Sequence, residues 1–377
     1  MHRRRRRRNG ILIGFLGLAA VLPLTAAFQK SGADTSAAFS LSGNTGDTEA
    51  WYNLAGDWND MDNWNVSSDG YGWQEETTLS TEASAAVAAT ETAGTEDTGE
   101  KPYPTTWNLN TDTTVERTFY GTYSGTRFFN LSTAGQVQNK TSLSNTALLA
   151  ESKLAPAFHI DIESGEPQVL IMHTHTTESF EPYVRASFDS SFNYRTTDPA
   201  YNVVSVGNAI TEQLEAAGIA TIHDTTIHDY PSYNGSYERS AETVKAILEE
   251  YPSICVVLDI HRDAIQDGNT LLQPVVEIDG KEAAQVMIIS GCDDGTMDMP
   301  DYLQNFHFAC RLQTSMEQMY PGLTRPILFD YRKYNQDLTT GSLLIEVGTH
   351  GNTLEQVQYA GELVGKALAE TLLKLEE

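Results

Sequence analysis

Residues 168–175 read QVLIMHTH, an apolar run that ends in two histidines. Two later stretches have the same form: residues 254–263 read ICVVLDIHRD, and residues 342–352 read SLLIEVGTHGN. Short runs of β-branched and apolar residues are typical of strands that are buried on both faces. We therefore expect three strands here, each followed by a polar cluster. Similar runs predict four more strands, at residues 219–222, 274–278, 286–290 and 326–329.

Amphipathic helices are expected between these strands. Residues 202–217 and 353–375 place apolar residues at steps of three and four, the spacing of a helix with one apolar face. Asp198-Pro199 is expected to start the first helix, and Asn352 with Glu355 the second. Alternating strands and helices predict an α/β fold for residues 167–377, with a mostly parallel central sheet flanked by helices.

The three polar clusters are expected to meet at one edge of this sheet, outside the carboxyl ends of the strands. A single histidine at a strand end is most often a structural residue. Three clusters that each combine a histidine with a carboxylate point instead to a catalytic Zn²⁺ site, in which three protein ligands leave a position for water. A carboxylate outside the ligand set then takes the proton of that water. The three cysteines have no metal-binding spacing.

The N-terminus has the pattern of a membrane anchor. Six consecutive arginines, Arg3 to Arg8, precede an uncharged apolar stretch at residues 11–28. We expect residues 11–28 to be a single transmembrane helix and residues 1–10 a basic cytoplasmic segment, which places the rest of the chain outside the cytoplasm. A cleavable signal peptide is the alternative, because small residues close the apolar stretch.

Residues 29–112 are expected to form a disordered acidic linker. Between Ser31 and Glu100 the chain has 14 acidic residues and neither lysine nor arginine. Such a segment repels itself and gives a folded domain reach from a membrane. All five tryptophans lie in it, so we expect none in the folded body. Residues 113–166 are expected to be a small ordered subregion of unknown role.

The overall charge excludes one class of partner. The chain has 24 lysines and arginines against 51 acidic residues, a net charge of -27. A chain this acidic offers no broad surface that neutralises phosphates, so we expect no nucleic-acid partner.

The strand-end motifs VLIMHTHTTESF, LDIHRDA and LIEVGTHGN resemble those of the stage II sporulation protein P family of membrane-anchored cell-wall hydrolases. The catalytic domain of that family is similar to zinc-dependent N-acetylmuramoyl-L-alanine amidases of the LytC and AmiC type. The resemblance covers residues 167–377. It implies that His175 and His261 bind zinc and that Glu346 is the general base.

The third zinc ligand is where the chain departs from the broader amidases, in which a glutamate at the start of the first helix binds zinc and an asparagine follows four residues later. Here Asp198 precedes Asn202 by four residues. We favour Glu178, because a glutamate three residues beyond a ligand can fold back onto the same ion, and because Asp198 is explained as a helix cap. His173, Arg262 and Asp198 are then expected to touch the substrate or to support the ligands.

The resemblance also implies a function. The expected reaction is hydrolysis of the amide between N-acetylmuramic acid and the first L-Ala of the stem peptide, with endopeptidase activity on peptide crosslinks as a second reaction. The implied setting is the sporulation septum, where the wall is thinned during engulfment. The implied partners are peptidoglycan and the stage II sporulation proteins D and M. Residues 179–200, a long segment without a predicted element, are expected to wall the substrate cleft.

The residues alone leave two other hypotheses about function open. If the protein is another secreted zinc amidohydrolase or a carboxypeptidase, the metal site is the same and the substrate differs. If it is a non-enzymatic cell-wall scaffold, the histidines are structural and the tryptophans bind a partner.

Overall fold

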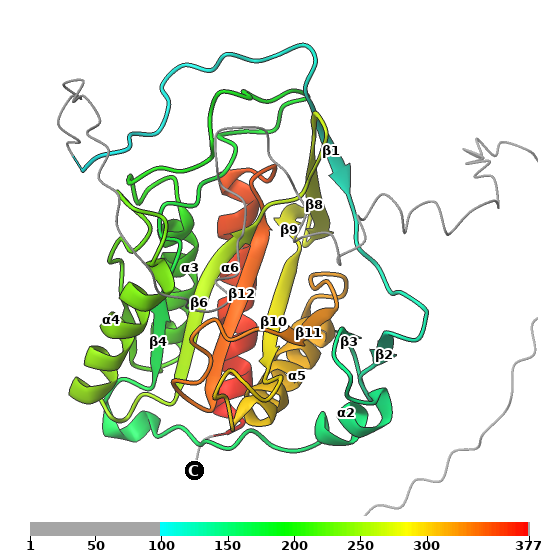
Figure 1. The fold of residues 1–377 in the computed structure, drawn as a ribbon, viewed down its shortest axis with the longest axis vertical. Coiled ribbons are helices and arrows are strands. Elements are labelled where there is room, and N and C mark those ends of the chain that lie inside the picture. Colours follow the sequence, from blue (N-terminus) through cyan, green and yellow to red (C-terminus); the bar gives the residue numbers. More distant parts are fainter. Residues whose placement is uncertain (1–98, 376–377) are drawn as a thin grey trace, which may run out of the picture. The chain divides into compact units, whose positions relative to one another are not determined.

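The computed structural model describes residues 99–375 (Figure 1). The expected cytoplasmic segment, the expected transmembrane helix at residues 11–28 and most of the expected linker lie outside the described residues. Within residues 99–375, no helix is both long enough and apolar enough to cross a bilayer.

A central sheet of eight strands organises the described part of the chain, in the order β2-β3-β11-β10-β12-β6-β4-β5. Its middle strands are almost wholly buried, as their continuous apolar runs predict. Each predicted strand overlaps an observed one. The bounds are β2 Phe128–Asn130, β3 Gln136–Asn139, β4 Val169–Met172, β5 Thr221–His223, β6 Val256–Asp263, β10 Val286–Cys292, β11 Ile327–Tyr331 and β12 Gly341–Thr349.

The sheet is mixed rather than mostly parallel, which corrects the prediction. β10 runs antiparallel to β12, and β2 runs antiparallel to β3, whereas the other neighbouring strands of this sheet are parallel. The reason lies in the connection before β10. A single residue, Gln285, separates β10 from the preceding strand β9, so the chain has no helix with which to return to the opposite edge of the sheet.

A smaller sheet lies beside the carboxyl ends of β6 and β12 (Figure 1). β8 pairs with β1 in parallel and with β7 and β9 antiparallel. The hydroxyl of Thr349, at the end of β12, donates to the carbonyl of Leu272 at 2.6 Å and ties the two sheets together. The bounds are β1 Thr114–Thr118, β7 Gln266–Asp267, β8 Thr270–Ile278 and β9 Lys281–Ala284.

Long helices cover both faces of the central sheet (Figure 1). One face packs into the main core with α3 (Val203–Ala216), α5 (Tyr302–Met319) and α6 (Leu354–Leu373). On the other face, α4 (Ser236–Glu250) packs through its apolar residues against alternate residues of β4 and β6. Because side chains alternate along a strand, positions 257, 259 and 261 of β6 share the face that α4 covers.

Both predicted helices form, but each begins later than its expected cap. Asn202 is the N-cap of α3, and its side chain accepts from the N–H of Val204 at 3.0 Å. Thr353 is the N-cap of α6 and forms a capping box with Gln356. Asp198, the expected cap, stabilises the turn before α3 instead.

The residues before β4 contribute strands to both the central and the smaller sheet. β3 pairs with β11 at the edge of the central sheet, and β1 joins the smaller sheet. α2 (Asn145–Glu151) and a short 3-10 helix (Ile162–Ser164) complete the segment. Trp107 contacts Phe192, and the guanidinium of Arg185 lies 4.3 Å from the ring centroid of Trp107. The expectation that no tryptophan lies in the folded body is therefore wrong for Trp107.

Candidate functional site

Three predicted ligands lie together at the carboxyl ends of β4 and β6. His175 and Glu178 come from the turn that follows β4, and His261 lies near the end of β6. One ligand atom from each lies within 4.8 Å of the other two, and all three residues are buried. The polar ends of these two parallel strands therefore meet at one sheet edge, as the sequence predicts.

A turn after β4 brings Glu178 back onto His175. The N–H of Glu178 donates to the carbonyl of His175 at 3.1 Å. Its carboxylate then faces both imidazoles: Oε1 lies 3.7 Å from His175 Nδ1, and Oε2 lies 3.4 Å from His261 Nδ1. Oε2 also accepts from the backbone N–H of Arg262 at 3.1 Å. Glu178 is thus fixed between histidines from two strand ends.

The three groups differ in their protonation. Burial lowers the pKa of His175 to about 3, so its imidazole is neutral, the form that binds metals. Burial alone raises the pKa of Glu178, but its hydrogen bond with His261 and the charge of Arg262 hold the pKa well below its usual value. Burial lowers the pKa of His261, but the carboxylates of Asp259 and Glu178 raise it well above its usual value. His261 therefore carries a proton that a metal ion would replace.

Asp259 holds the ends of β4 and β6 together. Its Oδ1 lies 2.9 Å from His261 Nε2 and accepts from the N–H of Thr174 at 2.8 Å. Its Oδ2 accepts from the hydroxyl of Thr174 at 2.7 Å. A carboxylate on the far nitrogen of an imidazole fixes the orientation of a metal-binding histidine. With Nε2 facing Asp259, the Nδ1 of His261 is the atom that faces Glu178.

Glu346 stands directly beside His261, because the two residues are partners in the parallel ladder of β12 and β6. Their side chains project from the same face of the sheet. Oε2 of Glu346 is buried and has no hydrogen-bond partner within residues 99–375. Burial, and then the neighbouring carboxylate of Asp263, raise the pKa of Glu346 to about 8. A carboxyl group with this pKa suits proton transfer near neutral pH.

The donor set fits a zinc ion. Two imidazoles and one carboxylate form the ligand set of a known class of catalytic zinc sites. Glu346 supplies a carboxylate outside that set. Its unpartnered Oε2 marks a place where a bound group, such as water, would satisfy a buried polar atom.

His173 lies near the cluster but has other partners. Its Nε2 lies 2.9 Å from the Nε2 of His223, and its Nδ1 lies 2.9 Å from the carbonyl oxygen of Ile260. Burial lowers the pKa of His173 to about 3. The backbone of Gly207 leaves room for the two rings, because a Cβ there would lie 2.8 Å from His173 Nε2.

Arg262 and Asp198 lie near the site but outside the histidine cluster. Arg262 follows His261 in β6 and therefore projects from the opposite face of the sheet. Its guanidinium donates to the carbonyls of Ser179 and Tyr194, both at 3.1 Å, and so holds the segment after Glu178. Asp198 accepts from the N–H of Ala200 at 3.0 Å and is not part of the histidine cluster.

Two charged residues beside the cluster were not predicted. Arg195 Nη2 lies 3.6 Å from Glu178 Oε1, and Arg195 Nη1 donates to Asp229 at 2.6 Å. Asp229 also accepts from the N–H and the hydroxyl of Thr177, at 3.1 and 2.7 Å. Arg195 and Asp229 are 34 residues apart in loops, so no periodicity or motif connects them.

Tyrosine rings cover the histidines. Tyr233 stacks on His175 with ring centroids 4.8 Å apart, and Tyr237 lies nearly parallel to His261 at 6.5 Å. The guanidinium of Arg195 lies 4.8 Å from the ring centroid of Tyr233. The start of α4 and the loop before it therefore close the cluster with aromatic rings.

Residues 179–200 pack against the smaller sheet. Phe188 and Tyr194 form a hydrophobic cluster with Leu271 of β8. A β-bridge between Glu178 and Arg195 ties the segment to the ligand turn. Through this bridge the segment borders the candidate site, and its role as a wall of the substrate cleft stays a prediction.

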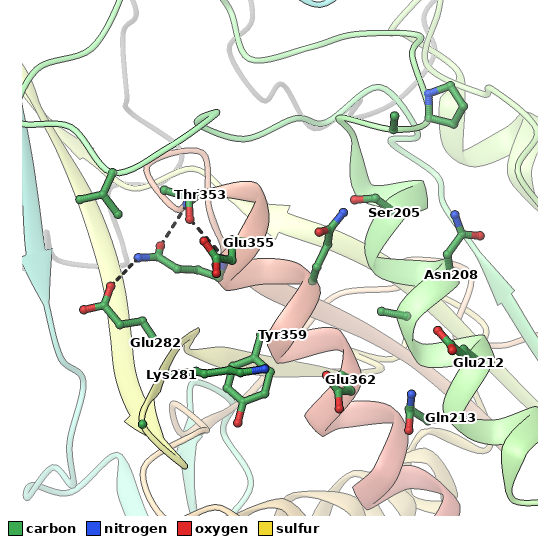
Figure 2. A pocket seen from close by; sticks show the side chains of 17 residues that line it. Ser205, Asn208, Glu212, Gln213, Lys281, Glu282, Thr353, Glu355, Tyr359 and Glu362 are labelled. Carbon is green, nitrogen blue, oxygen red and sulfur yellow. Dashed lines mark hydrogen bonds between the residues drawn. The ribbon is translucent and has the colours of Figure 1, made fainter.

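A groove of about 910 Å³ lies between α3 and α6, near β9 (Figure 2). Figure 2 shows Glu212 on α3, and Glu355 and Glu362 on α6, along the groove, with Lys281 of β9 close by. These helices cover the face of the sheet opposite to His261. The groove is therefore separate from the histidine cluster.

Comparison with known proteins gives a family match. A family model described as Stage II sporulation protein P (SpoIIP) matches residues 74–369. Stage II sporulation protein P of Bacillus subtilis (strain 168) is 32% identical to the chain over 213 residues, which are 54% of this chain and 50% of that protein. The chain thus spans about half the length of the curated relative that it matches.

Two solved structures are distantly similar to the chain. N-acetylmuramoyl-L-alanine amidase AmiC2 of Nostoc punctiforme is 13% identical with a TM-score of 0.33, over 55% of this chain and 96% of that one. The CwlD amidase from Clostridioides difficile, in complex with the GerS lipoprotein, is 12% identical with a TM-score of 0.36, over 55% of this chain and 98% of that one.

Proposed function

This chain belongs to the stage II sporulation protein P family, and on that premise we propose that it is a zinc-dependent peptidoglycan hydrolase. The bond that it cleaves is the amide between N-acetylmuramic acid and the first L-Ala of the stem peptide. The observation that carries the proposal is the buried group of His175, Glu178 and His261, with Glu346 beside His261 in the neighbouring strand.

His175, Glu178 and His261 would hold the zinc ion. A zinc ion at such a site supplies Lewis acidity and activates water near neutral pH. Asp259 orients His261 so that its Nδ1 faces Glu178, and the turn after β4 fixes Glu178 against His175. These contacts are made within the chain, so the ligands are in position before any substrate binds.

Glu346 would move the protons of the reaction. Its unpartnered Oε2 takes a proton from the attacking water and later gives a proton to the leaving amine. Burial and the neighbouring carboxylate of Asp263 raise the pKa of Glu346 in the metal-free chain, which favours a carboxyl group that can hold its proton until the amine leaves. The tyrosine rings over the histidines limit competing contacts with bulk water.

The proposal includes the cellular setting that the family implies. One helix at residues 11–28 would anchor the chain in the cell membrane, with the hydrolase domain outside the cytoplasm at the sporulation septum. There the enzyme would thin the wall during engulfment, cleave peptide crosslinks as a second reaction, and work with the stage II sporulation proteins D and M. The name of the Bacillus subtilis relative supports a role in sporulation.

Product analysis tests the proposal. Purified peptidoglycan is incubated with the zinc-loaded wild type, with Glu346→Gln and with Glu355→Gln, which changes an exposed glutamate of α6 as a matched control. Mass spectrometry should find stem peptides with a free L-Ala amino group for the wild type and the control. The Glu346→Gln variant should keep its zinc and release no product.

Other outcomes point to the alternative functions. New peptide ends without separation of muramic acid from L-Ala would identify a carboxypeptidase or an endopeptidase. No product from zinc-loaded wild type would refute the hydrolase for the chain acting alone and favour a cell-wall scaffold.

A further inference from the structure

Arg325 lies in the same row of the sheet as Glu346 and His261. The residue before Arg325 forms a parallel bridge with Val286 at the start of β10, which brings Arg325 level with Met287. Met287 is the ladder partner of Glu346, and Glu346 is the partner of His261. Arg325, two residues before β11, thus continues the row of side chains that carries the candidate base.

The guanidinium of Arg325 reaches across the sheet toward the candidate site. Its Nη2 lies 3.0 Å from the sulfur of Met287 in β10 and 2.7 Å from Oδ2 of Asp263 at the end of β6. β12 lies between β10 and β6 in the sheet. The side chain therefore passes over the strand that carries Glu346.

Two nitrogens of this guanidinium lack partners. Arg325 is 3% exposed, and its Nε and Nη1 are buried and donate to no protein acceptor within residues 99–375. A guanidinium has five N–H donors, and leaving donors buried and unpaired costs free energy. A negatively charged acceptor from outside the chain would satisfy them.

Tyr120 lies beside the guanidinium of Arg325. Its ring centroid lies 5.3 Å from Arg325 Cζ. Gln285 holds the backbone of Tyr120, accepting from its N–H at 2.7 Å and donating to its carbonyl at 2.9 Å. Tyr120 is thus held in place beside the guanidinium of Arg325.

We propose that Arg325 binds the α-carboxylate of the second residue of the stem peptide and thereby selects the peptides that the site accepts. This inference rests on the proposed function and names the group of the substrate that is recognised. Asp263 holds the guanidinium through Nη2 and leaves Nε and Nη1 for the substrate. Arg325 acts as a specificity-determining residue, since an arginine stays protonated and exchanges no proton with the reacting atoms.

The test measures binding to the full chain carrying Glu346→Gln, so that the ligands are not cleaved. Two soluble ligands are titrated by calorimetry: N-acetylmuramyl-L-Ala-D-Glu, and its D-isoglutamine counterpart, in which one carboxylate is an amide. The parent should bind the acid about tenfold or more tightly than the amide, the contribution of a buried charge-assisted hydrogen bond.

Variants at the ion pair then assign the preference to Arg325. Arg325→Gln combined with Asp263→Asn removes both charges and leaves neither unpaired, and the ratio of the two affinities should fall to about one. Asp263→Asn alone keeps Arg325 and should keep the preference. Arg325→Lys, a milder change, should reduce the ratio if the double change does not fold. Zinc content and thermal midpoint verify the fold of each variant.

Each outcome has a distinct meaning. An unchanged ratio in folded variants that lack Arg325 would overturn the inference. Equal binding of acid and amide by the parent would overturn it too, while the substrate class of the proposed function would stand. If the zinc-loaded parent binds neither ligand, the proposed function and the inference fail together.

Discussion

Asp259→Asn is expected to weaken zinc binding while leaving the fold intact. Asp259 lies 2.9 Å from His261 Nε2 and accepts two hydrogen bonds from Thr174, at 2.8 and 2.7 Å. An asparagine of the same shape keeps an oxygen for the N–H of Thr174, and its amide can donate to the threonine hydroxyl. What is lost is the negative charge beside the imidazole.

The size of the effect follows from this one lost contact. Removing the carboxylate that supports a metal-binding histidine lowers metal affinity by about 10- to 100-fold, which corresponds to about 1.4 to 2.7 kcal/mol. Asp259 also raises the pKa of His261 in the metal-free protein, against the opposing effect of burial. The variant therefore gives up the His261 proton more readily, which offsets part of the loss. We expect the lower half of the range, about 10- to 30-fold.

Competition with a chromophoric chelator at neutral pH measures the zinc affinity. Glu355→Gln, which changes an exposed glutamate of α6, is the control. The control should change the zinc affinity by less than about threefold, since an exposed charge is screened by solvent. The reasoning is refuted if folded Asp259→Asn binds zinc as the wild type does, or if the control weakens binding equally.

Three further predictions concern protonation, packing and access. Burial and Asp263 raise the pKa of Glu346 from 4.5 to about 8, so the stability that this group contributes below pH 4.5 is lost as the pH rises to about 8. Over that pH range, the free energy of unfolding of the metal-free wild type should fall relative to that of Glu346→Gln. If urea unfolding shows the same pH dependence for both proteins, this prediction is contradicted. Gly207→Ala places a Cβ 2.8 Å from His173 Nε2 and should lower the free energy of unfolding by about 1–3 kcal/mol in urea; a stabilised variant would contradict the crowding argument. Tyr233→Ala removes the ring stacked on His175 and should speed zinc release to a chelator in stopped flow, whereas equal rates would show that the ring does not limit access.

The strands and the strand-end clusters could be predicted because they depend on local pattern. The run before His173 is apolar throughout β4, and the run before His261 is apolar except at Asp259, as buried parallel strands favour. Parallel strands bring their carboxyl ends to one edge, so the grouping of His175 with His261 follows from topology alone. Glu178 could be predicted to lie beside His175 because a three-residue step in a turn brings its carboxylate back to the imidazole.

The direction of β10 could not be predicted from its residues. An apolar run reads the same in either direction, and only the hairpin before Gln285 reverses the strand. The helices α4 and α5 were not predicted either. α4 buries few apolar residues, with Val244 the main one, because much of it faces solvent.

The contacts around the cluster depend on tertiary structure. Arg325 lies in a loop before β11, and its partner Asp263 is 62 residues away in the sequence. Arg195 meets Glu178 only because the segment after Phe180 folds back as a β-bridge. The spacing of residues along the sequence does not predict contacts between such distant residues. The cap of α3 was misplaced for a related reason, since Asp198 and Asn202 both favour helix starts and packing selects between them.

Anomalous diffraction at the zinc absorption edge, from crystals of the zinc-bound chain, would locate the metal. We predict one strong peak at about 2.0–2.2 Å from one atom each of His175, Glu178 and His261, with Glu346 nearby but not bound. A peak between His173 and His223, or one held by Asp198, would contradict the proposed ligand set.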